Sequence, residues 1–294
     1  MSDLVLILSP TSGRNIMETQ IINGRKIRNE ILEDVKKGVF ELSFQPVFCD
    51  ILVGDDPVSA QYVAMKARTA ESVGIAFHNA NFKNDIKKEE LIIEINKIEN
   101  IENMSGIITQ LPLPDKSIQS EILNSIDIRF DVDCLNEASS NLFYENKNLI
   151  GFPTACACIH ILDSLNLDLK GKKIVVLGQG ILVGKPVTHL LKIKGYDVDT
   201  INSKTENKED LIKNADIIIT AVGKGKFIKG DMIKEGVVII DAGTSESEGG
   251  VVGDVDTISV TGIASYLSPV PGGVGPVTVA MLLKNVLTVA QGLK

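Results

Sequence analysis

Residues 173–186 read KIVVLGQGILVGKP, and this stretch decides the fold of the C-terminal half of the chain. The run Lys173–Leu177 has the length and the branched aliphatic content of a buried strand. It enters a turn at Gly178–Gly180, after which Gly184 and Pro186 suit the start of a helix. A strand, a glycine turn and a helix in this order are typical of a site that holds a pyrophosphate at the helix N-terminus. Because the spacing G-x-G-x-x-x-G is one residue longer than the usual pattern, a tight turn without any ligand remains the alternative.

The segments on both sides of this stretch also alternate between strands and helices. Their rhythm is that of a doubly wound parallel sheet, so we predict an α/β protein with a Rossmann-like nucleotide-binding domain at residues 152–276. Residues 21–151, with a closing helix over 277–294, are predicted to form an N-terminal α/β substrate domain, and residues 1–20 an extension. The remaining strands are expected at residues 46–53, 76–82, 105–110, 197–202, 216–221 and 237–241. The remaining helices are expected at residues 21–42, 59–72, 87–98 and 159–165.

The overall composition is that of an ordinary globular protein. A length of 294 residues favours two domains, and 44% hydrophobic residues can fill a substantial core. The formal net charge of -8 argues against binding to nucleic acids or anionic membranes, since both need a cationic surface. Leu4–Leu8 is too short for a secretory signal, and we expect no stretch that approaches membrane-spanning length.

The cysteines give no sign of a metal site. Cys156 and Cys158 are separated by one residue, which is too close for a zinc knuckle, although His160 stands nearby. We interpret them as small thiols packed beside a helix start, and we predict no bound metal. Free thiols without a secretory signal favour a cytoplasmic protein.

The end of the strand predicted at residues 197–202 helps to distinguish NADP from NAD as the bound dinucleotide. NAD would favour an acidic residue after the second strand, where the sequence instead reads Asn202-Ser203-Lys204. A hydroxyl and a cation suit a 2′-phosphate, so NADP is the predicted cofactor, and NAD remains the alternative. Lys204 is equally compatible with an ordinary exposed loop. The predicted cofactor-binding residues are Gly178, Gln179, Gly180, Val183, Gly184, Ser203, Lys204 and Thr244.

One helix carries a pair of residues suited to proton transfer. Asp56 is a plausible N-cap and Pro57 fits the first helical position, so a helix is predicted to begin here. On that helix Tyr62 and Lys66 are four residues apart, and their side chains therefore share one face. An amine in a partly dry cleft can donate or accept protons. By spacing alone, an ordinary Tyr–Lys pair on an exposed helical face is the favoured interpretation.

Longer motifs distinguish between these interpretations. Residues 53–59 read VGDDPVS ahead of Tyr62 and Lys66, residues 106–114 read GIITQLPLP, and residues 269–282 read PVPGGVGPVTVAML. Together with VGDVD at 252–256, they resemble the signatures of the bifunctional methylenetetrahydrofolate dehydrogenase/methenyltetrahydrofolate cyclohydrolase family. The resemblance extends from about Ile21 to the C-terminus.

The resemblance implies roles for individual residues. Lys66 would transfer protons in the cyclohydrolase step, Tyr62 would position the folate, and Gln110 would hold the lysine amine. The pterin N–H groups would be received by Asp133, and a folate cleft between the domains would be lined by Pro271, Gly272 and Gly273. The implied reaction is oxidation of 5,10-methylenetetrahydrofolate with NADP, followed by hydrolysis to 10-formyltetrahydrofolate. The family is commonly homodimeric.

Several stretches depart from the family pattern. They are Phe130–Cys134 in place of Lys-Asp-Val-Asp-Gly, Pro153–Cys156 in place of Pro-Cys-Thr-Pro, Gly178–Gly180 in place of Gly-Arg-Ser, Asn202–Lys204 in place of His-Ser-Lys, and Asp241–Ser245 near the expected nicotinamide. An arginine associated with the NADP phosphate is thereby lost. Two alternatives therefore stay open: a dehydrogenase with weak or no cyclohydrolase activity, and a catalytically silent subunit that binds folate or nucleotide.

Overall fold

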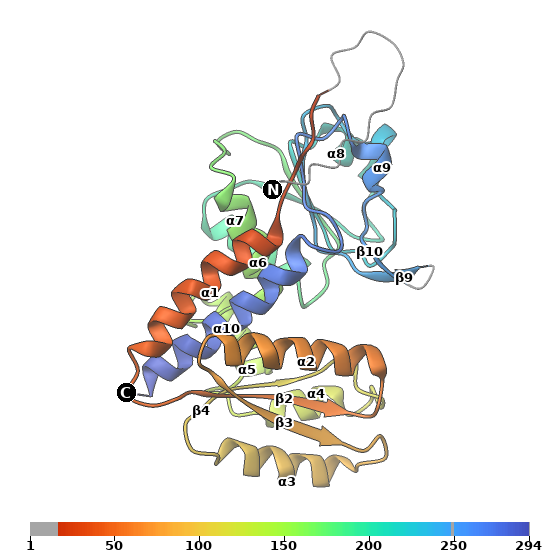
Figure 1. Ribbon diagram of the computed structural model, residues 1–294. Helices are drawn as coiled ribbons and strands as arrows, with labels where there is room; N and C mark the ends of the chain where they lie inside the picture. Colours follow the sequence, from red (N-terminus) through yellow and green to blue (C-terminus); the bar gives the residue numbers. More distant parts are fainter. Residues whose placement is uncertain (1–16, 248–249, 294) are drawn as a thin grey trace.

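The protein contains two parallel β-sheets joined by a layer of long helices (Figure 1). The computed structural model describes residues 17–247 and 250–293. A three-stranded sheet has the order β3-β2-β4, and a six-stranded sheet has the order β1-β11-β8-β7-β5-β6. This arrangement confirms the predicted α/β class, with an N-terminal α/β unit and a Rossmann-like doubly wound unit.

The smaller sheet presents helices on both faces. Its strands are β2 (Val47–Val53), β3 (Ala76–Phe82) and β4 (Met104–Thr109), and β2 is the central strand. Helix α2 (Pro57–Ser72) begins where the Asp56 side chain accepts the Ser59 N–H at 2.8 Å. Figure 1 shows α2 on one face of the sheet and α3 (Lys88–Glu99) on the other. Two short helices follow β4, namely α4 (Gln119–Ser125) and α5 (Glu137–Tyr144).

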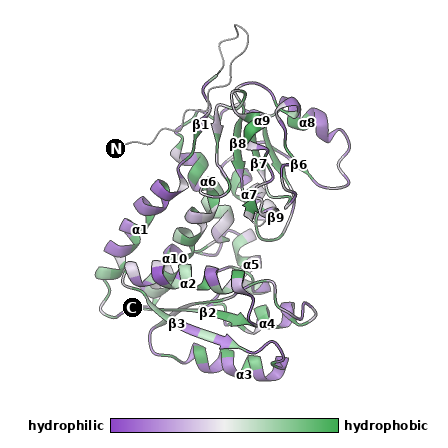
Figure 2. Cartoon of the chain, turned by 45° about the vertical axis from the view of Figure 1, so that its right-hand side comes forward, coloured by the Kyte–Doolittle hydropathy of each residue, from purple (hydrophilic) through white to green (hydrophobic). Residues whose placement is uncertain are grey.

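The larger sheet is wound in both directions from β5. Because β5 lies between β6 and β7, the strand order reverses there, and the carboxyl ends of these strands share one edge. The interior strands are hydrophobic in Figure 2, in agreement with their complete burial. The strands are β5 (Ile174–Leu177), β6 (Val198–Ile201), β7 (Ile217–Thr220), β8 (Val238–Asp241) and β11 (Tyr266–Leu267). The associated shorter elements are α7 (Gly184–Ile193), α8 (Lys208–Asn214), η1 (Gly230–Met232), α9 (Thr257–Val260) and the antiparallel pair β9 (Ser245–Ser247) and β10 (Gly250–Val252).

The end of the predicted extension belongs to the larger sheet. Strand β1 (Gln20–Ile21) pairs in parallel with β11 at the sheet edge. Thr19 adds a hydrogen bond from its hydroxyl to the Ala264 carbonyl at 2.7 Å. The apolar run Leu4–Leu8 lies outside the described residues.

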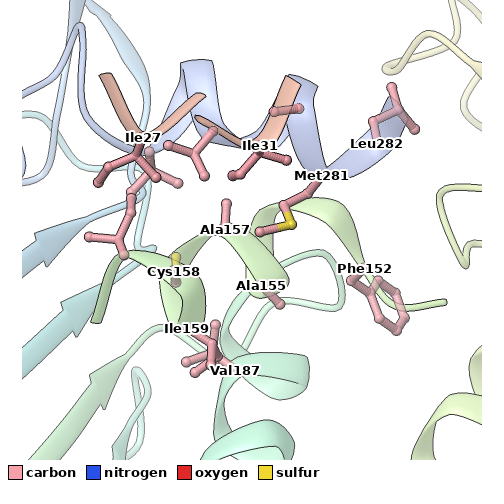
Figure 3. Close-up of a cluster of buried hydrophobic side chains, with 14 of the residues drawn as sticks. Ile27, Ile31, Phe152, Ala155, Ala157, Cys158, Ile159, Val187, Met281 and Leu282 are labelled. Carbon is pink, nitrogen blue, oxygen red and sulfur yellow. The ribbon is translucent and has the colours of Figure 1, made fainter. Parts of the chain in front are cut away.

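Three helices form the layer between the sheets. Helices α1 (Gly24–Phe40), α6 (Pro153–Ser164) and α10 (Val274–Gly292) pack against one another, and α10 also contacts β4. Figure 3 shows the shared core, where Ile31, Ala157 and Met281 meet beside Cys158. Helix α6 begins at Pro153, so the short helix predicted at residues 159–165 was too short at its N-terminus. Cys158 is fully buried, in keeping with a packing role.

Helix α10 requires a correction to the sequence analysis. Val274–Gly292 is long and apolar enough to cross a membrane by length and composition, so the expectation that no stretch approaches that length was wrong. The helix is 61% buried over its apolar window. It is also anchored by Asn285, whose Nδ2 donates to the carbonyls of Val132 at 2.9 Å and Gly151 at 2.7 Å. These contacts are those of a core helix, and a core helix can be as long and as apolar as a membrane-spanning one.

Candidate active site

Lys66 lies in a nearly closed site between α2 and the smaller sheet. The residue is only 8% exposed, and its Nζ donates a hydrogen bond to Gln110 Oε1 at 2.8 Å. Gln110 directly follows β4, and its backbone N–H donates to the Ile51 carbonyl at 2.8 Å. Its Nε2 donates to the Leu111 carbonyl at 3.1 Å, which leaves Oε1 facing the lysine. The structure thus brings together the predicted Lys66 and Gln110, and Lys66 is not the exposed residue that spacing alone allowed.

A second partner of Lys66 was missed by the sequence analysis. Asp50 Oδ2 lies 2.5 Å from Lys66 Nζ, and Asp50 is 0% exposed in the middle of β2. Burial raises the pKa of this carboxyl, while the charge and hydrogen-bonding capacity of Lys66 act in the opposite direction. The signal in the sequence was a single acidic residue within the apolar strand VFCDILV, because a buried carboxylate is costly unless it is paired.

Asp133 contributes a further carboxyl group to the same region. It is half-buried in the segment that follows β4 and α4. Burial raises its pKa to about 7, the charge of Lys66 opposes this rise, and the charges of Asp131 and Asp50 add to it. Asp131, in contrast, accepts backbone N–H groups from Asn136 at 2.8 Å and Leu135 at 3.3 Å. The two acids of this motif therefore differ: Asp131 organises the backbone, and Asp133 is left to interact with other groups.

The backbone at Cys134 explains one departure from the family pattern. Cys134 has a φ of 59°, in the left-handed region that favours glycine, and its side chain is fully buried. The family pattern has glycine at this position. The chain keeps a glycine-like backbone here despite the cysteine side chain, at a cost of roughly 1–2 kcal/mol.

Tyr62 and the proline–glycine loop are separate from the Lys66 cluster. Tyr62 lies one turn before Lys66 on α2 and is 42% exposed. The loop at residues 271–273 is fixed to α1, because Gly24 N–H donates to the Gly272 carbonyl at 3.0 Å. A Cβ on Gly24 would stand 1.8 Å from the Gly273 oxygen, so the two backbones are in close contact. Within the described residues, no hydrogen bond or ion pair joins Lys66 to Tyr62 or to this loop.

The glycine turn after β5 is as tight as its sequence predicts. Gly178 has a φ of 86°, and a Cβ on Gly184 would stand 1.8 Å from the Gly178 oxygen. Gly180 differs from both, since nothing lies within 4 Å of a Cβ built there. The Gln179 side chain folds back, donating to the Gly178 carbonyl at 2.9 Å and to Thr188 Oγ1 at 3.3 Å. Val183 precedes the first residue of α7.

The other predicted cofactor residues lie after neighbouring strands. Ser203 and Lys204 are exposed in the turn after β6, where Asn202 Oδ1 accepts the Lys204 N–H at 2.8 Å. Thr244 is exposed between β8 and β9. Because β5, β6 and β8 are parallel strands of one sheet, the segments that follow them leave the same edge. The chain therefore carries a glycine turn, a hydroxyl and a cation along one sheet edge, as a dinucleotide phosphate site requires.

A network of two buried carboxylates supports this edge. Asp254 accepts hydrogen bonds from Thr220 Oγ1 at 2.7 Å, Val222 N–H at 2.6 Å and Lys224 N–H at 2.8 Å. Asp241 accepts the backbone N–H groups of Gly243 at 2.9 Å, Asp254 at 3.1 Å and Val255 at 2.9 Å. The sequence analysis quoted the motif that contains Asp254 but assigned it no role. These contacts hold together the segments after β7 and β8.

Both parts of the chain match known family models. Residues 22–133 match the model described as tetrahydrofolate dehydrogenase/cyclohydrolase, catalytic domain. Residues 153–294 match the model described as tetrahydrofolate dehydrogenase/cyclohydrolase, NAD(P)-binding domain.

Relatives match over nearly the whole chain. A protein of Caldanaerobacter subterraneus subsp. tengcongensis named bifunctional protein FolD is 38% identical over 92% of this chain and 96% of its own length. The solved structure of the FolD methylenetetrahydrofolate dehydrogenase/cyclohydrolase from Campylobacter jejuni has a TM-score of 0.89 and 33% identity, covering 94% of this chain and 100% of that one. The Trypanosoma brucei enzyme, solved with NADP and an inhibitor, has a TM-score of 0.87 and 31% identity, covering 94% and 98%.

Proposed function

Because the chain belongs to the tetrahydrofolate dehydrogenase/cyclohydrolase family, we propose that it oxidises 5,10-methylenetetrahydrofolate with NADP and hydrolyses the product to 10-formyltetrahydrofolate. The family match and the FolD relatives agree with the sequence-based expectation of this two-step reaction. The observation in the chain itself that carries the proposal is the buried contact between Lys66 Nζ and Gln110 Oε1. A lysine that is removed from bulk water and held in place by a hydrogen bond is suited to moving protons at a fixed position.

In the oxidation step, the chain mainly binds and aligns its ligands. NADP, when bound, would accept the hydride that leaves the methylene carbon. Gly178 and Gly184 allow the tight turn that leads into α7, and Gly180, with open space at its Cβ position, allows a phosphate to approach the backbone ahead of that helix. Ser203 and Lys204 are the residues placed to receive a 2′-phosphate, with Thr244 on the segment after β8.

In the hydrolysis step, the chain moves protons through Lys66. Water adds to the methenyl carbon, the water oxygen loses both of its protons as the formyl group forms, and the bond from that carbon to N5 breaks. N5 takes up a proton, so the products are 10-formyltetrahydrofolate and one released proton. Lys66 receives and returns these protons, and Gln110 fixes the lysine while they move.

The substrate is held by residues around this lysine. We assign the pterin N–H groups to Asp133, whose carboxylate lacks the backbone donors that occupy Asp131. Tyr62 offers an exposed ring one turn from Lys66, and we assign Pro271, Gly272 and Gly273 to the lining of the folate cleft. The Gly272 backbone, with a φ of 109° and open space at its Cβ position, suits close approach to a flat ring.

The organisation of the chain forms part of the same proposal. Residues 21–151 with the closing helix 277–294 constitute the folate-binding domain, and residues 152–276 constitute the nucleotide-binding domain. Helix α10 packs against α1 and β4 of the proposed folate-binding domain and also against α6 of the proposed nucleotide-binding domain, whereas β1 extends the larger sheet from the N-terminal side. We further propose a cytoplasmic homodimer. The four free cysteines of each chain fit a reducing compartment.

The test is oxidation of methylenetetrahydrofolate with NADP and NAD measured in parallel, with the fate of the methenyl product followed spectroscopically. We expect oxidation with preference for NADP, followed by consumption of the methenyl product. In Lys204→Ala the KM for NADP should rise about tenfold, a loss of about 1.4 kcal/mol in binding. Lys229→Ala, which removes a lysine near η1, is the charge-matched control. Failure to oxidise the substrate with either nucleotide would reject the dehydrogenase, and accumulation of the methenyl product would reject the cyclohydrolase.

A further inference from the structure

Asp50 is a buried charged residue whose surroundings differ from those of a structural carboxylate. It lies on the central strand of the smaller sheet, is 0% exposed, and has its Oδ2 atom 2.5 Å from Lys66 Nζ. Among the described residues, neither of its oxygens has a hydrogen bond of good geometry. The close approach to Lys66 is therefore an ion pair, and the carboxylate depends on that lysine alone.

The charges around Asp50 come from several elements. Lys66 faces it from α2, Cys49 is its neighbour on β2, and the charge of Asp50 acts on Asp133 in the segment after β4. Asp131 adds a further negative charge to Asp133. Burial makes the ionised form of Asp50 costly, and its pKa is raised despite Lys66. The neutral carboxylic acid is thus an accessible state of this residue.

We propose that Asp50 is a positioning residue that shares one proton with Lys66 during hydrolysis of the methenyl substrate. This inference rests on the proposed function. The proton leaves Lys66 Nζ for Asp50 Oδ2, so the carboxylate and ammonium become a neutral acid and a neutral amine. The amine then takes the first proton of the attacking water, and it gives a proton to N5 when the bond from the methenyl carbon to N5 breaks. The second water proton leaves for solvent as the formyl C=O forms, and Asp50 returns its proton to Lys66, so the pair ends as it began.

This arrangement predicts a particular dependence of hydrolysis on pH. The working state of the Asp50–Lys66 pair carries one shared proton. It forms when the pair of carboxylic acid and ammonium loses a proton, and it disappears when the pair loses its remaining proton to leave a carboxylate and an amine. The rate of the wild-type enzyme should therefore show a plateau with an acidic and a basic limb, and both limbs belong to the pair. In Asp50→Asn the proton has to leave Lys66 for solvent, so the profile should have one limb that rises with pH.

The decisive experiment measures hydrolysis across the pH range for four proteins: the wild type, Asp50→Asn, Lys66→Met and the double variant. At pH 7 we expect Asp50→Asn to lower kcat of hydrolysis at least about tenfold, with recovery towards high pH. In the Lys66→Met background the same change should alter the residual rate less than about twofold, because Asp50 acts through the lysine. Asp50→Val, which suits an apolar strand, should give the same one-limbed profile if Asp50→Asn folds poorly.

Cys49→Ala is the matched control, because it disturbs the same buried strand at a residue that packs with the cluster around α3. It should keep the two-limbed profile. The inference is overturned if Asp50→Asn and Asp50→Val keep that profile, or if Asp50→Asn lowers hydrolysis equally with and without Lys66. Loss of hydrolysis in the wild type itself would instead reject the proposed function, so the two failures are distinguishable.

Discussion

Asp50 and Asp254 are both fully buried aspartates, one within the smaller sheet and one in a bend beside the larger sheet, but their environments are opposite. Asp254 accepts three hydrogen bonds, from the Thr220 hydroxyl and two backbone N–H groups. Asp50 has a single ionic partner, Lys66. A carboxylate surrounded by fixed donors stabilises one backbone arrangement and has little capacity left for a reaction. A carboxylate that depends on a titratable amine can change its protonation with that amine. The comparison separates a scaffold site from a reactive one.

The largest test of the reactive site is Lys66→Met. This change keeps an unbranched side chain up to the ε-carbon and removes the amine, so hydrolysis of the methenyl substrate should fall about 10²- to 10⁴-fold while part of the dehydrogenase activity remains. The measurement is the rate of each step on one preparation. Arg68→Met, two residues along α2, is the matched control and should keep both rates. Hydrolysis by Lys66→Met well above the nonenzymatic background would remove the basis for treating this site as reactive.

Most of the fold followed from the sequence because local patterns were clear. Strand β3 occupies the predicted residues 76–82, and the glycine turn lies between β5 and α7 as expected. Strand β1 was not predicted, since two residues carry no periodicity and their partner, β11, lies near the other end of the chain. The early start of α6 was also missed, because the predicted boundary between the two domains lies directly before it, between residues 151 and 152.

The candidate site was only partly predictable. The contact between Lys66 and Gln110 was expected from the family resemblance, since their separation in sequence gives no local signal. Asp50 was overlooked because seven residues of β2 read as one apolar run, and the partner on α2 becomes visible only when the helix is folded over the strand. The left-handed backbone at Cys134 likewise needed the structure, although the replaced family glycine pointed to it.

The scaffold side of the comparison is tested by Asp254→Ala. Three donors would lose their acceptor inside the protein, so the free energy of unfolding should fall by about 3–5 kcal/mol. The KM for NADP should also rise, because Val222 and Lys224 on the segment after β7 lose their anchor. Urea unfolding measures the first effect. Asp256→Ala is the control within the same motif, since Asp256 makes no side-chain cap hydrogen bond. Equal losses for the two variants would contradict a special role for Asp254.

Asp241 sharpens the comparison, because it combines three backbone donors with deep burial. Burial raises its folded pKa to about 7 from 3.8, so between these values the folded state holds more protons than the unfolded state. Its contribution to stability is therefore complete below about pH 4 and is lost as pH rises through about 7, with a magnitude of roughly 2–4 kcal/mol. Urea unfolding between pH 4 and pH 8 should show this slope, and Asp241→Asn should flatten it. An unchanged slope would mean that the N–H donors outweigh burial.

The smallest expected effect concerns Asp133, which links the reactive site to substrate binding. Its pKa of about 7 means that the acceptor carboxylate is progressively lost as pH falls below 7, and a protonated acid receives the pterin N–H groups less well. The KM for methylenetetrahydrofolate should therefore rise up to about tenfold per pH unit below 7, near 1.4 kcal/mol per unit. Asp133→Asn should have a raised KM at pH 8 that no longer depends on Asp133 titration, while the KM for NADP reports any general effect of pH. A wild-type folate KM that stays constant from pH 5.5 to pH 8 would assign the pterin to another acceptor. Asp133 would then belong with Asp254 as a structural carboxylate, and Lys66 with Asp50 would remain the sole titrating part of the site to be tested.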